Sequence, residues 1–329
     1  MMRAVIVGSP GNREKLVVKE VPRPEARRGE VLIKVEYAGC NWGDIQKRQG
    51  IYPDPVSYPC ILGGEGSGYI VACGDGVRDF SVGQPVAFMA GTDMLGAFAE
   101  YISIPVSLVI PLSSDFDLRE AAAMPIAALT AFHLLHTAYR LRRTHRILIH
   151  SISGGVGLML TQWAHIQGAT IYGTVGTAAK SSDALSLGAH LVVDRSKDDF
   201  VDVILDATDG QGVDLVIDSL GADILPRSFS VLRYFGHLIN IGEAAGEPDF
   251  PVRKTLYLRS SSMSGFELRH VHHDLRRWRY GVRVLMRALD TSQLRVIIGH
   301  EFAMHEIRAA QECLEGRLSV GKVILKVTS

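Results

Sequence analysis

The apolar positions of the chain follow two different patterns, and the change falls near Asp117. Residues 1–110 contain short β-rich runs separated by Gly, Pro and Asp, which is typical of strands joined by turns. Beyond Asp117, helix-like stretches alternate with short apolar runs, and this order indicates parallel strands connected by helices. The strands expected in the first region are Ala4–Val7, Leu16–Val21, Val31–Tyr37, Gly68–Ala72, Pro85–Met89 and Ala97–Ile104.

The second region predicts an α/β arrangement. Its parallel-strand candidates are Ile147–His150, Ile171–Val175, Leu191–Val193, Leu215–Asp218 and His237–Ile241. Helices are expected over Leu118–Met124, Ala127–Tyr139, Leu275–Leu289 and Met304–Leu314, and a last strand over Lys322–Val327. We therefore predict a β-rich domain over residues 1–122 and a doubly wound parallel-sheet domain over 123–265. The tail 266–329 is expected to return to the first domain and complete it.

A tight turn of small residues, Ser153-Gly154-Gly155-Val156-Gly157, follows the apolar run Arg146–His150 and precedes the helix-favouring stretch Leu158–Gln167. Strand, glycine turn and helix together direct backbone N–H groups and the positive end of a helix at one point, where a pyrophosphate can bind. Glycine suits the turn because a Cβ would block the approach of the phosphates. The alternative is a plain strand-to-helix turn, but the second strand-like run, Thr170–Val175, favours a dinucleotide site.

The residues after the second strand bear on which nucleotide binds. An NAD site usually places an acidic residue about 20 residues beyond the glycines, where it accepts from the ribose 2′-OH. Here no acidic residue occurs between Gly157 and Asp183, and the second strand ends in Gly176-Thr177-Ala178-Ala179-Lys180. Thr177, Lys180 and, after the third strand, Arg195 could contact a 2′-phosphate. The cofactor is therefore predicted to be NADPH, although Lys180 could also be a solvated lysine at a helix start.

Composition narrows the class of protein. With 47% apolar and 21% charged residues and a formal net charge of zero, the 329-residue chain suits ordinary globular domains and gives no support for nucleic-acid or anionic-membrane binding. The longest mostly apolar run, Ala121–Phe132, is too short to cross a bilayer. Met1–Gly8 goes straight into a strand without a secretory apolar segment, and Cys40, Cys60, Cys73 and Cys313 are scattered. These features predict a cytoplasmic protein with reduced thiols.

Short motifs recur in order along the whole chain, at 39–44, 50–53, 63–68, 96–101, 123–125, 129–131, 153–157, 212–219, 239–242 and 321–323. Together they resemble the motifs of medium-chain dehydrogenases/reductases. The chain is similar to the zinc-free quinone oxidoreductase branch, related to zeta-crystallin and to the enoyl reductase domains of fatty-acid and polyketide synthases. The resemblance implies a GroES-like catalytic domain, a Rossmann domain that binds NADPH, and a homodimer joined at the Rossmann sheet edge near Ser261–Phe266.

The resemblance also implies roles for individual residues. Tyr52 is the candidate hydrogen-bond or proton donor to the developing oxyanion, and Asn41 is expected beside the nicotinamide. Tyr52 could instead be a loop aromatic before Pro53, and Asn41 a structural turn residue. Thr130 would line the cofactor, and the strand-end residues Ser219, Ile241 and Gly242 would contact it.

No metal is predicted. Zinc-dependent relatives carry Cys where this chain has Asn41 and His where it has Gly64, and no cysteine lies between Cys73 and Cys313. Zinc needs three or four converging His, Cys or carboxylate ligands, which these positions do not supply. Cys40, beside the ligand position, faces the wrong way if the run is extended. The histidines of 270–273 are interpreted as solvated or interfacial.

The predicted reaction is hydride transfer from NADPH to a quinone or an α,β-unsaturated carbonyl, without a metal. Many enoyl reductases carry Lys where this chain has Glu243, and an ionised carboxylate cannot donate a proton, so Tyr52 or water is expected to take that role. A second hypothesis is an enoyl-thioester reductase or tailoring enzyme that acts on a carrier-bound substrate. A third is a non-catalytic protein that binds NADPH or RNA.

Overall fold

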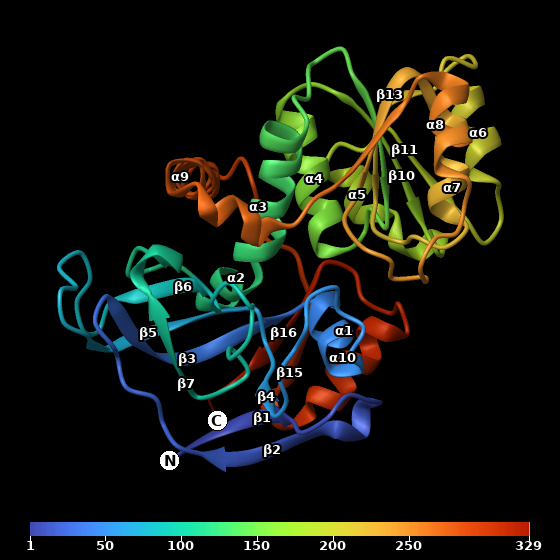
Figure 1. Ribbon diagram of the computed structural model, residues 1–329. Helices are drawn as coiled ribbons and strands as arrows, with labels where there is room; N and C mark the ends of the chain where they lie inside the picture. Colours follow the sequence, from blue (N-terminus) through green and yellow to red (C-terminus); the bar gives the residue numbers. More distant parts are fainter. Residues whose placement is uncertain (329) are drawn as a thin grey trace. The chain divides into compact units, whose positions relative to one another are not determined.

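The computed structural model describes residues 1–328, which form two compact units (Figure 1). The first unit comprises Met1–Ala127, His272–Arg276 and the C-terminal segment from Val296, and the second comprises Ala128–Val271 and Arg277–Arg295. Each unit has its own sheet system and its own core. In the described part of the chain, none of the helices is long and apolar enough to span a membrane.

The first unit is built on β strands, as its sequence pattern predicts. A seven-stranded sheet has the order β15-β16-β3-β5-β6-β8, with β7 also paired to β3, and a smaller sheet has the order β2-β1-β4. The strands are β1 (Met2–Val7), β2 (Leu16–Val21), β3 (Glu30–Cys40), β4 (Cys60–Ile61), β5 (Glu65–Cys73), β6 (Pro85–Met89), β7 (Tyr101–Pro105), β8 (Val109–Pro111), β15 (Ile298–Ala303) and β16 (Lys322–Lys326). Its helices are α1 (Trp42–Gln49), α2 (Leu118–Ala123) and α10 (Ile307–Glu315).

One strand prediction in this unit was wrong in its bounds. The run Ala97–Ile104 does not form one strand, because its first residues bond to a different partner from its last ones. Ala97 and Phe98 donate to the carbonyls of Gly63 and Leu62, and Phe98 accepts from Val5 of β1. Only β7, which begins at Tyr101, pairs with β3. A strand-like run in sequence does not show which strand each of its residues pairs with.

The second unit is a parallel six-stranded sheet of order β11-β10-β9-β12-β13-β14. In chain order this is 3-2-1-4-5-6, the order of dinucleotide-binding folds, and it confirms the doubly wound prediction. The strands are β9 (Arg146–His150), β10 (Thr170–Val175), β11 (Leu191–Asp194), β12 (Val213–Asp218), β13 (Leu232–Asn240) and β14 (Ser262–Gly265). The helices are α4 (Gly155–Ile166), α5 (Ser182–Ser186), α6 (Phe200–Ala207), α7 (Ile224–Ser228) and α8 (Val252–Arg259), and α3 (Pro125–His133) leads into the unit.

Helix α9 (Leu275–Asp290) has a buried stripe of Trp278, Gly281, Leu285 and Ala288. This stripe packs on α3: a Cβ on Gly281 would come within 2.5 Å of the His133 ring. The ring centroids of Phe132 and Tyr280 lie 5.9 Å apart. Arg277–Arg295 therefore belongs to the second unit, whereas the sequence predicts that the whole tail 266–329 completes the first.

Candidate active site

The glycine turn lies between β9 and α4, at the point where the strand order of the parallel sheet reverses. Helix α4 begins at Gly155, three residues earlier than predicted, because two of the glycines belong to its first turn. Its N-cap is Gly154, which has no side chain to accept from the first-turn N–H groups. A Cβ on Gly157 would lie 2.5 Å from the Ile152 carbonyl oxygen, so only glycine fits there. The first-turn N–H groups are thus available to an anionic ligand.

Most of the predicted cofactor residues lie at the carboxyl ends of the parallel strands. Gly176 and Thr177 follow β10, and Arg195 follows β11, where its N–H donates to the Val175 carbonyl at 3.0 Å. Ser219 follows β12, and Ile241 and Gly242 follow β13. Because these strands are parallel, their carboxyl ends meet at one edge of the sheet, where such folds bind nucleotides. Lys180 ends the short helix after β10. Thr130, buried on α3, is not part of this row of strand ends.

Two aspartates at these strand ends were not singled out from the sequence. Asp218 accepts from the N–H groups of Leu220 and Gly221, at 3.2 and 3.0 Å, and so holds the turn that contains Ser219. Asp194 accepts from the N–H of Ala178 and from Ser196, whose hydrogen bonds lower the pKa of the Asp194 carboxyl. Both carboxylates are anchors of the backbone. The sequence feature that could have pointed to them is an Asp at the end of a predicted strand.

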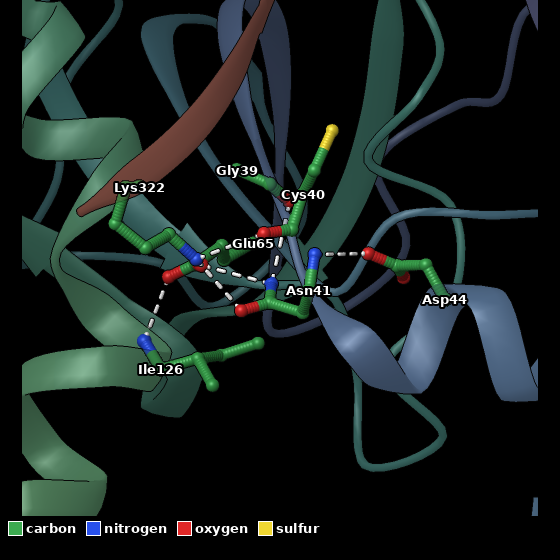
Figure 2. A network of polar contacts seen from close by, with 7 residues as sticks. All are labelled: Gly39, Cys40, Asn41, Asp44, Glu65, Ile126 and Lys322. Atoms are coloured by element: carbon green, nitrogen blue, oxygen red, sulfur yellow. Dashed lines mark hydrogen bonds and ion pairs between the residues drawn. The ribbon is translucent and has the colours of Figure 1, made fainter. Parts of the chain in front are cut away.

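In the first unit, Asn41 lies in a network of polar contacts between the end of β3 and the start of α1 (Figure 2). Its side-chain amide donates to Glu65 Oε1 at 2.9 Å and to the Gly39 carbonyl at 3.3 Å. Its amide oxygen accepts from Lys322 Nζ at 2.7 Å. Both ends of the amide are therefore engaged within the protein, and this geometry favours a positioning role for Asn41 over direct contact with a substrate.

The centre of this network is a buried ion pair. Lys322 Nζ lies 2.6 Å from Glu65 Oε1, and the exposed fractions of the two side chains are 6% and 0%. Lys322 also donates to the Cys40 carbonyl at 3.2 Å, and Glu65 Oε2 accepts from the Ile126 N–H at 2.7 Å. The pair thus joins β3, β5, β16 and the start of α3. The sequence does not indicate this pairing, because 257 positions separate the two residues.

Asp44 and Cys40 flank the network. Asp44 Oδ2 accepts from the Asn41 backbone N–H at 2.8 Å and so caps α1. Burial raises the pKa of Asp44 to about 6, and the nearby Lys47 ammonium opposes this shift. Burial also raises the pKa of the Cys40 thiol. The Cys40 sulfur points away from the Lys322 ammonium in Figure 2, so it does not take part in the network.

Tyr52 follows α1 and is half-buried beside it. Lys47 Nζ lies 4.7 Å from the centroid of the Tyr52 ring, and a Cβ on Gly43 would lie 3.4 Å from that ring. The sequence does not single out Lys47, because a lysine on a short helix is usually solvated.

Among residues 1–328, no group of three or more His, Cys, Asp and Glu side chains is placed to hold a metal ion. Asn41 and Gly64 stand where zinc relatives carry ligands. Of the histidines at 270–273, His272 is half-buried, and its Nε2 lies 3.1 Å from Ser107 Oγ.

Comparison with known proteins agrees with this geometry. A family model described as the alcohol dehydrogenase GroES-like domain matches residues 27–114, and one described as zinc-binding dehydrogenase matches 155–279. The chain is 34% identical to a probable quinone oxidoreductase of Schizosaccharomyces pombe over 96% of this chain and 94% of that protein. It belongs to the medium-chain dehydrogenase/reductase superfamily, in its zinc-free quinone oxidoreductase branch.

Two further relatives extend the comparison. The chain is 31% identical to a 2-haloacrylate reductase of Burkholderia sp, with 99% of each protein covered. The structure is similar to that of the Escherichia coli quinone oxidoreductase in complex with NADPH, with a TM-score of 0.92 and 27% identity over 98% of this chain and 99% of that chain. The match to the zinc-binding dehydrogenase model covers residues 155–279 and so includes neither Asn41 nor Gly64.

Proposed function

We propose that this medium-chain reductase transfers a hydride from NADPH to an electron-poor carbon of a quinone or an α,β-unsaturated carbonyl, without a metal. The observation that carries the proposal is the glycine turn at the start of α4, at the reversal point of a 3-2-1-4-5-6 parallel sheet. The relatives support it, because they include quinone oxidoreductases, a 2-haloacrylate reductase and a structure with NADPH bound. We assign the cofactor site to the second unit and the substrate-handling residues to the first.

The residues of the second unit fit a dinucleotide. Gly154 to Gly157 offer first-turn N–H groups and leave room for a diphosphate, which the positive end of α4 would stabilise. Ser153, Thr130, Ser219, Ile241 and Gly242 are proposed as the remaining contacts along the cofactor. Bound NADPH would supply the hydride, and the protein would position it and handle the charge that develops on the acceptor.

Thr177, Lys180 and Arg195 are proposed to recognise the 2′-phosphate of NADPH. The end of β10 carries no carboxylate to accept from a ribose 2′-OH, and the one at the end of β11, Asp194, is engaged with Ala178 and Ser196. Lys180→Ala should weaken NADPH binding by roughly tenfold or more while changing NADH binding little. Equal losses for both nucleotides in a binding titration would remove Lys180 from this site.

In the first unit, Tyr52 is the proposed donor to the oxyanion, and Asn41 is proposed to position the surrounding backbone. Hydride addition to the β-carbon of an enone, or to a quinone, leaves negative charge on oxygen, which a hydrogen-bond donor stabilises. Tyr52→Phe should lower kcat by about 100-fold while leaving NADPH affinity nearly unchanged. An unchanged kcat would assign Tyr52 a structural role.

The proposed reaction suits a free substrate or one bound as a thioester, and one surface favours testing the thioester. Arg279, Arg283 and Arg287 are exposed on one face of α9, at spacings of four residues. Such a row could bind the phosphates of a coenzyme A or phosphopantetheine arm. If so, replacing Arg279 and Arg283 by Ala should raise KM for a 2-enoyl thioester and leave that for a small free enone unchanged.

We also propose a homodimer joined at the edge strand β14. This strand pairs only with β13 among the described strands, and exposed Tyr234, Phe235 and Tyr257 lie on or beside the same end of the sheet. Exposed apolar side chains beside an open edge favour association. Tyr257→Lys should shift the sedimentation coefficient from dimer to monomer, and a monomeric wild type would contradict the proposal. A cytoplasmic location stays a prediction from the sequence.

The experiment that tests the function is oxidation of NADPH and of NADH by the purified protein with a quinone series and a 2-enoyl thioester series. Turnover of quinones with NADPH supports a quinone oxidoreductase, and turnover of thioesters supports the carrier-bound alternative. Binding of NADPH without turnover of either series would contradict both acceptor classes.

A further inference from the structure

We propose that Lys47 is a positioning residue that acts through Tyr52. Its ammonium, fixed against the face of the Tyr52 ring, makes that phenol a better proton donor to the oxyanion formed by hydride transfer. The inference rests on the proposed function of Tyr52 and adds a residue that neither the motifs nor the comparisons assign.

The Lys47 side chain is held in one place. Only 2% of the residue is exposed, and its Nζ donates to the carbonyl oxygens of Asp93 and Met94, at 2.5 and 2.9 Å. A buried cation is costly unless partial negative charges surround it. The two carbonyls supply part of that charge, and the Tyr52 ring, whose centroid lies 4.7 Å away, supplies more through its electron-rich face.

Local backbone geometry brings the lysine and the tyrosine together. Helix α1 ends at Gln49, and Gly50 takes a left-handed conformation with a φ of 76°, which turns the chain back. The Tyr52 ring then lies beside α1, against Gly43 and Lys47. Tyr58, from the same loop, donates to the Lys47 carbonyl. Two loops are thus fixed to the last turn of α1: residues 50–58, which carry Tyr52 and Tyr58, and residues 91–94, two of whose carbonyls accept from Lys47.

The chemistry follows from these contacts. Hydride addition to the acceptor carbon moves an electron pair onto the carbonyl oxygen. The Tyr52 hydroxyl gives its proton to that oxygen, which yields an enol or a quinol and leaves a phenolate. The phenolate is stabilised by the Lys47 ammonium and regains a proton from water. Since Lys47 donates to two backbone carbonyls, it is placed to supply charge to the ring rather than the proton itself.

Other titratable groups face the lysine and belong to the same electrostatic balance. The Lys47 ammonium opposes the increase in the pKa of Asp44 that burial causes. It acts in the same direction on Cys60, whose pKa is raised by burial and by Asp93. Burial also raises the pKa of Tyr58. Because Asp44 shares the cation, its replacement is one of the controls.

The first test needs no substrate. The titration of Tyr52 is followed by the near-ultraviolet absorbance of its phenolate, as the difference between each protein and the same protein with Tyr52→Phe. Lys47→Met should raise the Tyr52 pKa by about one unit, equivalent to a tenfold weaker acid. Lys47→Gln, which keeps a donor for the two carbonyls but no charge, should do the same, while Lys47→Arg should move it much less. Two controls separate a general effect of charge from the effect of Lys47 on Tyr52. Lys19→Met removes an exposed lysine, and Asp44→Asn removes a carboxylate that faces Lys47.

The second test uses turnover. Lys47→Met and Lys47→Gln should lower kcat roughly tenfold with little change in KM, and move the alkaline limb of the kcat profile to higher pH. In the Tyr52→Phe background the same changes should cost almost nothing. An unshifted Tyr52 titration, or an equal loss of kcat with and without Tyr52, would overturn the inference. If the titration shifts but wild-type protein reduces neither quinones nor enones, the coupling stands and the proposed function fails.

Discussion

The two units differ in the charged side chains that they bury. Among the described residues, the first unit buries cations together with carboxylates: Glu65, Lys322, Asp44, Lys47 and Arg48 are each at most 5% exposed. The second unit buries carboxylates such as Asp218, but no lysine or arginine, and its buried histidines pair with neutral groups. Its clearest case is His150 on β9, whose ring nitrogens lie 2.9 and 2.8 Å from the hydroxyls of Thr174 and Ser228. Burial lowers the pKa of His150 to about 3 and that of His133 to about 4, so both imidazoles are neutral at physiological pH.

The difference matches what the proposed function requires of each unit. A diphosphate can be held by backbone N–H groups at a helix start, which need no buried charge behind them. Stabilising an oxyanion requires directed charge in a region of low dielectric, and such charge is costly to bury unless it is paired. In this chain the Glu65–Lys322 pair forms a fixed charge arrangement that holds both ends of the Asn41 amide.

The largest expected effect on stability comes from removing one partner of the buried ion pair. Lys322→Met leaves Glu65 ionised and buried without its cation, and we expect a loss of about 3–5 kcal/mol in the free energy of unfolding. Urea unfolding measures it. The double variant Glu65→Gln with Lys322→Met should recover much of the loss, because no charge then remains buried.

A surface pair provides the matched control. Arg227 and Asp199 lie 2.6 Å apart, but their side chains are 41% and 45% exposed. Arg227→Met should cost only about 0–1 kcal/mol. Similar losses for the buried and the exposed pair would show that burial of charge does not distinguish the first unit.

The next effect concerns the second unit, where the backbone N–H groups of the glycine turn are proposed to hold the diphosphate. Gly157→Ala would place a methyl group 2.5 Å from the Ile152 carbonyl oxygen, and we expect about 1–3 kcal/mol of destabilisation together with weaker NADPH binding. Gly8→Ala is the control, since a Cβ there meets nothing within 4 Å and the residue belongs to no proposed site. Thermal unfolding with and without NADPH compares the two, and a tolerated Gly157→Ala would contradict the close packing of the turn.

His150 should make the second unit sensitive to acid. Its pKa is about 3 when folded and about 6.5 when unfolded, so the unfolded state binds more protons between these values. The stability it contributes is complete above pH 6.5 and is lost as the pH falls toward 3, with a slope of at most about 1.4 kcal/mol per pH unit. His150→Gln should flatten this dependence in urea unfolding. His305→Gln, at an exposed histidine, should not.

Asp44 should give the stability of the protein the opposite pH dependence to that of His150, over a narrower range of pH. Its folded pKa of about 6 lies above the ordinary 3.8, so the stability it contributes is complete below about pH 3.8 and is lost as the pH rises through 6. Asp44→Asn should therefore gain stability relative to wild type between pH 4 and 7. Exposed Asp79→Asn is the control, and a variant whose relative stability does not change with pH would show that Asp44 is ionised throughout.

Much of the fold could be predicted because it depends on short stretches of chain. The runs at 147–150, 171–175, 191–193, 215–218 and 237–241 all lie in the parallel sheet, and the glycine turn lies at its reversal point. Strand periodicity, small residues in a turn and family motifs are all local signals. They also led to the superfamily and to the predicted cofactor.

What only the tertiary structure decided are contacts between distant segments. The pairing of Glu65 with Lys322, the place of α9 beside α3, and the division of 97–104 between two partners all join residues far apart in sequence. The burial of Lys47 under the 91–94 loop is another such contact. The type of a residue determines which chemistry its side chain can do, but not what surrounds it. Burial and hydrogen-bond partners set the free energy of a charged group, and both arise only when the chain has folded.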